Sequence, residues 1–215
     1  MSLTGTHHAF ASIDEHGVNV VLHAFFTARP RYLHYGSAPF VTANSTTETL
    51  ISPIAFPGVA GGISYAIDFT IPVVDLYPPN GTLPAPLVLD PGKLSISTTV
   101  AITIGCAVPK GNDGRGSVHP VSTKLRVIAI AHPSGVYVSP GVGHITFHVD
   151  EVLIPDIEPV TLRAVLDCLL EMTLNAVLSS VQLPFNIIDV DFFKIILEEG
   201  PTIADDQIEL WGDIS

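Results

Sequence analysis

The side chains best suited to chemistry form one short row. His144, Thr146, His148 and Asp150 alternate along a strand-like segment, so they share one face, and imidazole and carboxylate groups are common metal ligands. The two histidines are four strand residues apart, about 13 Å at ~3.3 Å per residue. That separation is too large for one ion unless another strand supplies ligands. A solvated strand face is therefore the simpler interpretation.

Two pairs of adjacent carboxylates, Glu198-Glu199 and Asp205-Asp206, could in principle transfer protons. Both pairs lie at expected turns, where acidic side chains are ordinarily solvated. The sequence contains neither the nucleophile motif G-x-S-x-G nor the zinc motif H-E-x-x-H. We therefore expect no catalytic residues, no metal site and no cofactor, and we expect the protein not to be an enzyme.

Basic side chains are few. Lys124 and Arg126 share a strand face and could hold an anionic lipid head group, although an exposed strand face is the simpler interpretation. The pair His7-His8 lies near the start of the chain, where a floppy N-terminus is a simpler interpretation than a metal site.

The composition excludes several classes of protein. The 215 residues include 9 Lys+Arg and 21 Asp+Glu, which gives a formal net charge of −12 and no basic patch for nucleic acid. Hydrophobic residues make up 47% and charged residues 14%, the reverse of a disordered chain. The sequence shows no signal peptide and no membrane span. We expect a single domain over residues 1–215, located in the cytoplasm or released without a signal peptide.

A helix is predicted over residues 13–28. The segment from Ser12 to Glu15 has the capping-box pattern, and Pro30 prevents continuation. Arg29 is a cation at the expected C-terminal end, where the helix dipole favours positive charge. Helical spacing places four apolar residues on one face: Val18, Val21, Leu22 and Phe25.

Residues 32–150 change to a period of two. Apolar and smaller or polar residues alternate over 63–71, 94–102 and 145–150, which predicts antiparallel strands separated by Pro- and Gly-containing turns. A second helix is predicted over residues 159–180 from a wide apolar stripe at helical spacing. Closing strands are expected within 187–213, at 187–197 and 207–211, joined by a turn at 198–201.

This order of elements resembles the tubular lipid-binding superfamily, which includes bactericidal/permeability-increasing protein and lipid-transfer relatives. The resemblance is carried by residues 176–185 (AVLSSVQLPF), by 192–196 (FFKII) and by 203–213 (IADDQIELWGD). It implies an α+β fold in which a long, strongly curved antiparallel sheet wraps two long helices. Some bacterial members of this fold belong to toxin-associated gene clusters.

The resemblance also implies an elongated apolar cavity between the helices. Six residues would line it: Val21, Leu22, Phe25, Leu166, Leu170 and Leu174. The same stripes would equally pack a dry core. The expected function is non-enzymatic binding or carriage of a lipid or other apolar ligand, without nucleic acid and without insertion into a membrane. The alternative is a structural or interaction protein, such as a component of a toxin or secretion assembly, with a protein partner or a second copy.

Overall fold

The computed structural model describes residues 7–42, 44–55, 63–107, 118–139, 142–155, 157, 183–186, 189–190 and 193–214. The chain divides into two compact units. Unit 1 comprises Met1–Val21, Val73–Ser97 and Ile128–Ser215, and unit 2 comprises Leu22–Pro72 and Thr98–Val127. The boundary runs through one helix and two strands.

Helix α1 (Glu15–Ala28) confirms the predicted helix, but it begins differently. Asp14 is the residue that caps it, because its Oδ1 accepts a hydrogen bond from the Gly17 backbone N–H at 2.7 Å. Ser12 instead lies in strand β1 (Ala9–Asp14). The predicted capping box is therefore wrong: the Glu15 carboxylate accepts hydrogen bonds from Leu76 and Asn80 rather than from the start of its own helix.

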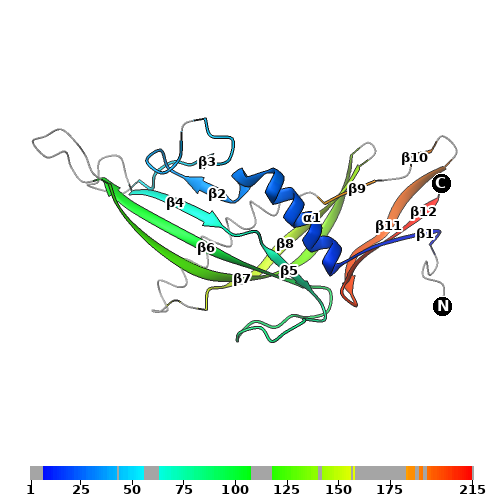
Figure 1. Cartoon of the computed structure of the whole chain (residues 1–215). Coiled ribbons are helices and arrows are strands. Elements are labelled where there is room, and N and C mark those ends of the chain that lie inside the picture. Colours follow the sequence, from blue (N-terminus) through cyan, green and yellow to red (C-terminus); the bar gives the residue numbers. More distant parts are fainter. Residues whose placement is uncertain are drawn as a thin grey trace, which may run out of the picture. The chain divides into compact units, whose positions relative to one another are not determined.

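Unit 1 contains a four-stranded antiparallel sheet in the order β1-β12-β11-β10 (Figure 1). Its other strands are β12 (Gln207–Ile214), β11 (Phe193–Ala204) and β10 (Asp189–Val190). Asp205 and Asp206 form the two-residue turn between β11 and β12, with φ of 48° and 61°.

The turn predicted at residues 198–201 is wrong, because these residues lie inside β11. The pairing register with β12 shifts there, between Leu197 and Glu199 and again between Glu199 and Thr202. A β-bulge of this kind accommodates Gly and Pro, which are otherwise typical of turns. Gly200 has φ of +103°, a conformation that favours glycine.

Unit 1 contains further strands among its described residues. Strand β5 (Val73–Leu76) pairs with the start of β6 (Leu94–Ala107). The later part of β7 (Val118–Ser139) pairs with β8 (Val142–Leu153), which pairs with β9 (Leu183–Asn186). A buried apolar cluster lies among these segments: Leu87, Leu89, Ile128, Ile130 and Leu153.

Unit 2 is a small sheet beside the later half of α1 and a short 3₁₀ helix, η1 (Pro30–Tyr32). Strand β2 (His34–Gly36) pairs in parallel with β3 (Thr49–Leu50) and antiparallel with β4 (Ile63–Phe69). Strand β4 pairs along its whole length with the later half of β6, from Ile63 opposite Cys106 to Phe69 opposite Val100. The strand order is β3-β2-β4-β6 (Figure 1).

The strands predicted at 63–71, 94–102 and 145–150 are confirmed as parts of β4, β6 and β8, which pair antiparallel with their neighbours, whereas β2 and β3 pair in parallel. The predicted fold of two long helices wrapped by a sheet is wrong. Most of the described residues lie in strands, and α1 is the one α-helix among them. Its 14 residues span about 21 Å at 1.5 Å per residue, whereas β7 alone has 22 residues. The helix predicted at 159–180 lies outside the described residues. Within the described part of the chain, no helix has the length and apolar character needed to cross a membrane.

Candidate ligand-binding site

The three predicted ligand residues on α1 have unequal exposure. Leu22 is buried, whereas Val21 and Phe25 are partly buried. The apolar face is also rotated from the predicted one, since Phe26 is buried where the spacing had favoured Phe25. The other predicted lining residues, Leu166, Leu170 and Leu174, lie outside the described residues. That these three residues line a cavity together with residues of α1 therefore stays a prediction.

An apolar surface is found on the sheet of unit 2. Ile63, Tyr65 and Ile67 alternate along β4, and residues paired across an antiparallel ladder share a face with their partners. We call this surface the isoleucine face; it comprises Tyr35, Ile54, Ile63, Tyr65, Ile67, Ile102 and Ile104.

The isoleucine face is only partly covered. Phe69 and Val100 are buried at one end of it, whereas Ile104 is 47% exposed and Ile54 is 50% exposed. The opposite face of the same strands carries small or polar residues, of which Ser64 and Ala66 are buried and Asp68 is partly buried. The covered face of β4 is therefore the one with small side chains, and the isoleucine face keeps larger apolar side chains partly in contact with water.

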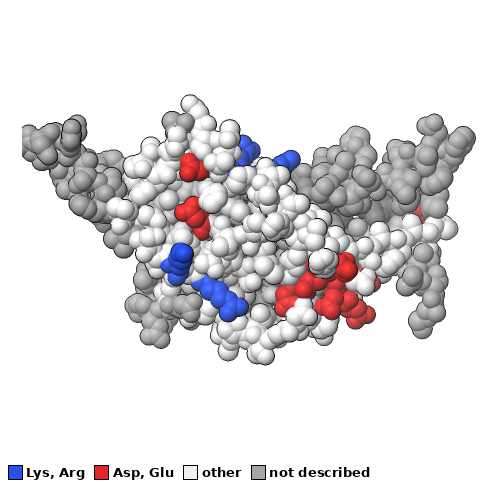
Figure 2. All heavy atoms as spheres, viewed as in Figure 1, with Lys and Arg blue, Asp and Glu red and all other residues white. Residues whose placement is uncertain are grey.

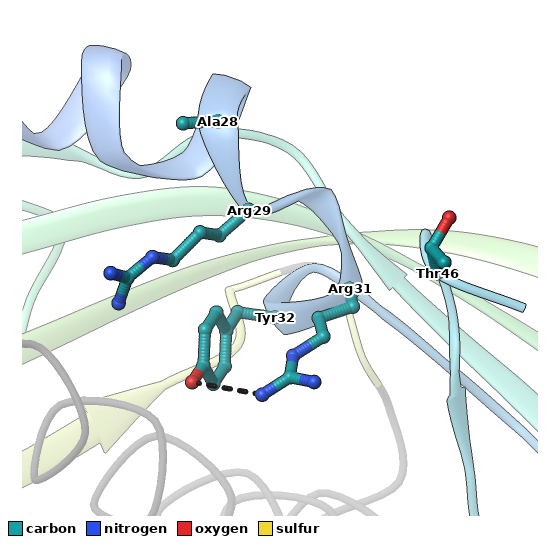
Figure 3. A pocket seen from close by; sticks show the side chains of 5 residues that line it. All are labelled: Ala28, Arg29, Arg31, Tyr32 and Thr46. Atoms are coloured by element: carbon teal, nitrogen blue, oxygen red, sulfur yellow. Dashed lines mark hydrogen bonds between the residues drawn. The ribbon is translucent and has the colours of Figure 1, made fainter.

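A pocket of about 220 Å³ lies at the C-terminal end of α1, also in unit 2. It is lined by Ala28, Arg29, Arg31, Tyr32 and Thr46 (Figure 3). Figure 3 shows the Arg29 and Arg31 side chains on either side of the Tyr32 ring. Arg31 Nη2 donates to the Tyr32 hydroxyl at 3.4 Å. The polar groups beside the pocket therefore include two guanidinium groups and the Tyr32 hydroxyl.

Aromatic rings hold both arginines. The Phe25 and Tyr32 rings stack with centroids 5.6 Å apart and planes inclined by 25°. The Arg29 Cζ lies 5.1 Å from the Phe25 ring centroid, and the Arg31 Cζ lies 5.1 Å from the Tyr32 ring centroid. Such cation–π contacts position a guanidinium while its in-plane N–H groups stay available.

The two tyrosines near this pocket have opposite pKa shifts. The hydrogen bond from Arg31 lowers the pKa of Tyr32, and the charges of Arg31 and Arg29 act in the same direction. Burial raises the pKa of Tyr35, and the neighbouring Tyr32 adds to this rise. The pocket is thus electropositive, and Tyr35 of the isoleucine face lies on β2, which follows and contacts η1.

Two residues of the predicted row on β8, His148 and Asp150, contact side chains of other segments. His132 on β7 pairs with His148, and the two rings lie 5.5 Å apart. Asp150 accepts a hydrogen bond from His132 at 2.8 Å and forms an ion pair with Lys93 at 3.4 Å. No group of three or more His, Cys, Asp or Glu among the described residues is arranged to hold a metal ion.

The floppy N-terminus predicted at His7 and His8 is wrong, because both residues contact Asp213. The His8 backbone N–H donates to Asp213 Oδ1 at 3.0 Å, and His7 Nδ1 lies 3.3 Å from Asp213 Oδ2. The hydrogen bond from His8 is the main reason that the pKa of Asp213 is lowered. Strand β12 was predicted, but its pairing with β1 was not.

Acidic side chains gather elsewhere in unit 1. Burial raises the pKa of Glu15, the hydrogen bond from Leu76 opposes this, and the charges of Asp75 and Asp206 raise it further. Figure 2 shows a group of Asp and Glu side chains collected in one patch on the visible face.

Lys124 and Arg126 are exposed on β7 and form no ion pair with the residues that the structure describes.

Comparison with known proteins shows little similarity. No protein-family profile matches the chain, and no curated protein matches it. One solved structure, the crystal structure of a lipopolysaccharide binding protein, aligns with a TM-score of 0.35 and 15% sequence identity. The alignment covers 71% of this chain but only 32% of that protein, so the chain spans about a third of its length. The superfamily resemblance therefore stays a prediction.

The arginine pocket was missed from the sequence, although part of its signal is visible there. Arg29 and Arg31 flank Pro30, and Phe25 precedes Tyr32 by seven residues. The sequence indicated a role for Arg29 alone, as a cation that is favourable at the C-terminal end of a helix. The pocket forms because η1 turns the chain directly after α1, which places Tyr32 against Phe25.

Proposed function

We propose that the protein binds a lipid or another apolar ligand without transforming it, and that the isoleucine face of unit 2 contacts the apolar part. The observation that carries this proposal is the partial exposure of a row of isoleucine and tyrosine side chains on one face of a sheet. Covering such a face is favourable by about 25 cal/mol per Å² of apolar surface removed from water.

The absence of catalytic motifs from the sequence supports a binding role over an enzymatic one. The large number of apolar residues and the low charge content favour an apolar ligand over a nucleic acid or a polar polymer. Partly covered apolar surface of this kind is typical of ligand-binding or partner-binding sites.

The experiment is a titration of a fluorescent fatty-acid probe into wild-type protein and two variants. Ile104→Ser removes apolar contact from the isoleucine face, and Val88→Ser is a matched change at a 66%-exposed position of unit 1. At about 0.8 kcal/mol per methylene contact, Ile104→Ser should weaken binding about three- to tenfold. Val88→Ser should leave it unchanged. A probe that does not saturate, or an equal loss in both variants, would contradict the proposal.

A second candidate function is an interaction protein, favoured by exposed apolar residues of unit 1. Val20 and Val73 are 52% and 57% exposed, and they lie next to Asn19 and Val74, which hydrogen-bond to each other. Light scattering across a range of protein concentrations tests self-association. A mass that rises with concentration in the wild type, but not in Val73→Asp, would favour this candidate.

A further inference from the structure

Among the described residues, Arg29 and Arg31 of unit 2 have no acidic partner. The chain has 21 Asp+Glu for 9 Lys+Arg, so carboxylates are abundant. Lys93 accordingly contacts both Asp90 and Asp150. Arg29 and Arg31 form no ion pair with any described residue and instead contact aromatic rings.

We propose that the pocket formed by Arg29, Arg31, Tyr32 and Thr46 binds a phosphate-type oxyanion, and that this group is the head group of the ligand whose apolar part contacts the isoleucine face. The second half of this proposal rests on the proposed function, whereas the first half does not.

The donor groups of the pocket suit an anion with several oxygen atoms. Each guanidinium can donate two parallel N–H bonds to one oxyanion, which is the geometry that makes arginine the preferred partner of phosphate. Tyr32 accepts its hydrogen bond from Arg31, so its own O–H remains able to donate.

The pocket is held in place before any ligand binds. The stack of Phe25 on Tyr32 fixes the rings against which the two guanidinium groups lie. The backbone of Arg31 is fixed as well, because its carbonyl accepts a hydrogen bond of 2.7 Å from the Thr49 hydroxyl. Side chains positioned in this way lose little conformational freedom when they bind an anion.

A simpler role exists for one of the two arginines. Arg29 directly follows α1, and a cation there is stabilised by the negative end of the helix dipole. That dipole would also weaken the attraction of an anion. It does not account for Arg31, which lies two residues further on and contacts Tyr32 rather than the helix end.

The pocket and the isoleucine face share a neighbour. Tyr35 belongs to that face through its pairing with Ile67, and it lies on β2, the strand that follows Tyr32 after one residue and contacts η1. An amphiphilic molecule with its oxyanion in the arginine pocket would therefore have apolar surface close to its head group.

The test compares three probes on the full-length protein by isothermal titration calorimetry: inorganic phosphate, a monoacyl glycerol phosphate below its micelle concentration, and the monoacylglycerol with the same chain. The wild type should bind the phosphate lipid at least tenfold more tightly than the uncharged lipid. Arg29→Gln/Arg31→Gln should abolish this preference, and Tyr32→Phe, which keeps the ring stack, should reduce it. Lys110→Gln/Arg115→Gln removes the same charge elsewhere in the sequence of unit 2 and should retain the preference.

The outcomes separate the two proposals. Equal wild-type affinity for the two lipids would overturn the oxyanion pocket and leave apolar binding intact. Binding of phosphate alone, with no gain from the acyl chain, would support the pocket and overturn the lipid function. An equal loss in both double variants would attribute the preference to overall charge and overturn the pocket. Binding of none of the probes would overturn both proposals.

Discussion

The Asn19 side chain forms hydrogen bonds with both backbone groups of Val74. Asn19 Nδ2 donates to the Val74 carbonyl at 2.8 Å, and Asn19 Oδ1 accepts from the Val74 N–H at 2.8 Å. A side-chain amide of α1 thus satisfies the backbone groups of β5 at Val74, as the residue of a neighbouring strand would do.

Asn19→Ala should lower the free energy of unfolding by about 1–3 kcal/mol, because both groups of Val74 lose their partner. Urea unfolding followed by circular dichroism measures the change. Thr27→Ala is the control, since Thr27 is exposed on the same helix, and its effect should stay within about 0.5 kcal/mol. Similar values for the two variants would show that the Asn19 contacts contribute nothing.

Gly200→Ala should destabilise the protein by about 1–3 kcal/mol. The residue has φ of +103°, and an added Cβ would lie 2.8 Å from the Glu209 carbonyl oxygen. Gly81→Ala is the matched control, because no atom lies within 4 Å of the Cβ that would be added there. Thermal unfolding of both variants provides the measurement. A melting temperature for Gly200→Ala equal to that of Gly81→Ala would contradict the strained register of β11.

The raised pKa of Glu15 predicts a pH-dependent cost of its negative charge. Because the folded-state pKa lies above the unfolded one, the folded protein binds the proton more tightly, and stability falls as pH rises through this range. Above the folded pKa the cost is constant. Glu15→Gln removes the charge, so the stability of the variant relative to wild type should increase from about pH 4 to pH 7. A difference that does not change with pH would contradict the prediction.

Tyr32 should ionise at a lower pH than an ordinary tyrosine, and Tyr35 should ionise at a higher pH. Ultraviolet titration of phenolate absorbance can resolve them, since the chain has five tyrosines and Tyr32→Phe identifies one transition. Arg31→Gln should move the Tyr32 transition to higher pH, because it removes the hydrogen bond that lowers the pKa. An unchanged transition in Arg31→Gln would place the cause elsewhere.

The sequence predicted the strands of the central region well because their alternation reflects real two-sided burial. Ile63, Tyr65 and Ile67 share a face of β4, as their spacing indicates. It did not predict β1, because β1 is defined by pairing with β12 at the far end of the chain. Long-range pairing of that kind leaves no local pattern.

The local sequence was ambiguous where two neighbouring positions were equally suited to the same structural role, such as a helix cap or a turn. Asp14 and Ser12 are both good N-cap residues, and the helix begins at the one that leaves Ser12 free to pair with Glu209. Likewise Gly200 and Pro201 suit a turn or a bulge equally, and here they lie at a bulge of β11, whereas the turn expected at Asp205 and Asp206 is present. The arginine pocket depended on where η1 directs Tyr32, which composition and spacing do not specify.

The pairing of β1 with β12 has a consequence for synthesis on the ribosome. Strand β1 is synthesised well before β12, so Ala9 emerges long before its partner Gly212, and the contact of Glu15 with Asp206 likewise waits for residues far along the chain. Strand β1 must therefore remain without these native partners while the intervening segments are made. Nascent chains stalled before β12 should expose β1 to proteases or chaperones, and synthesis through β12 should protect it.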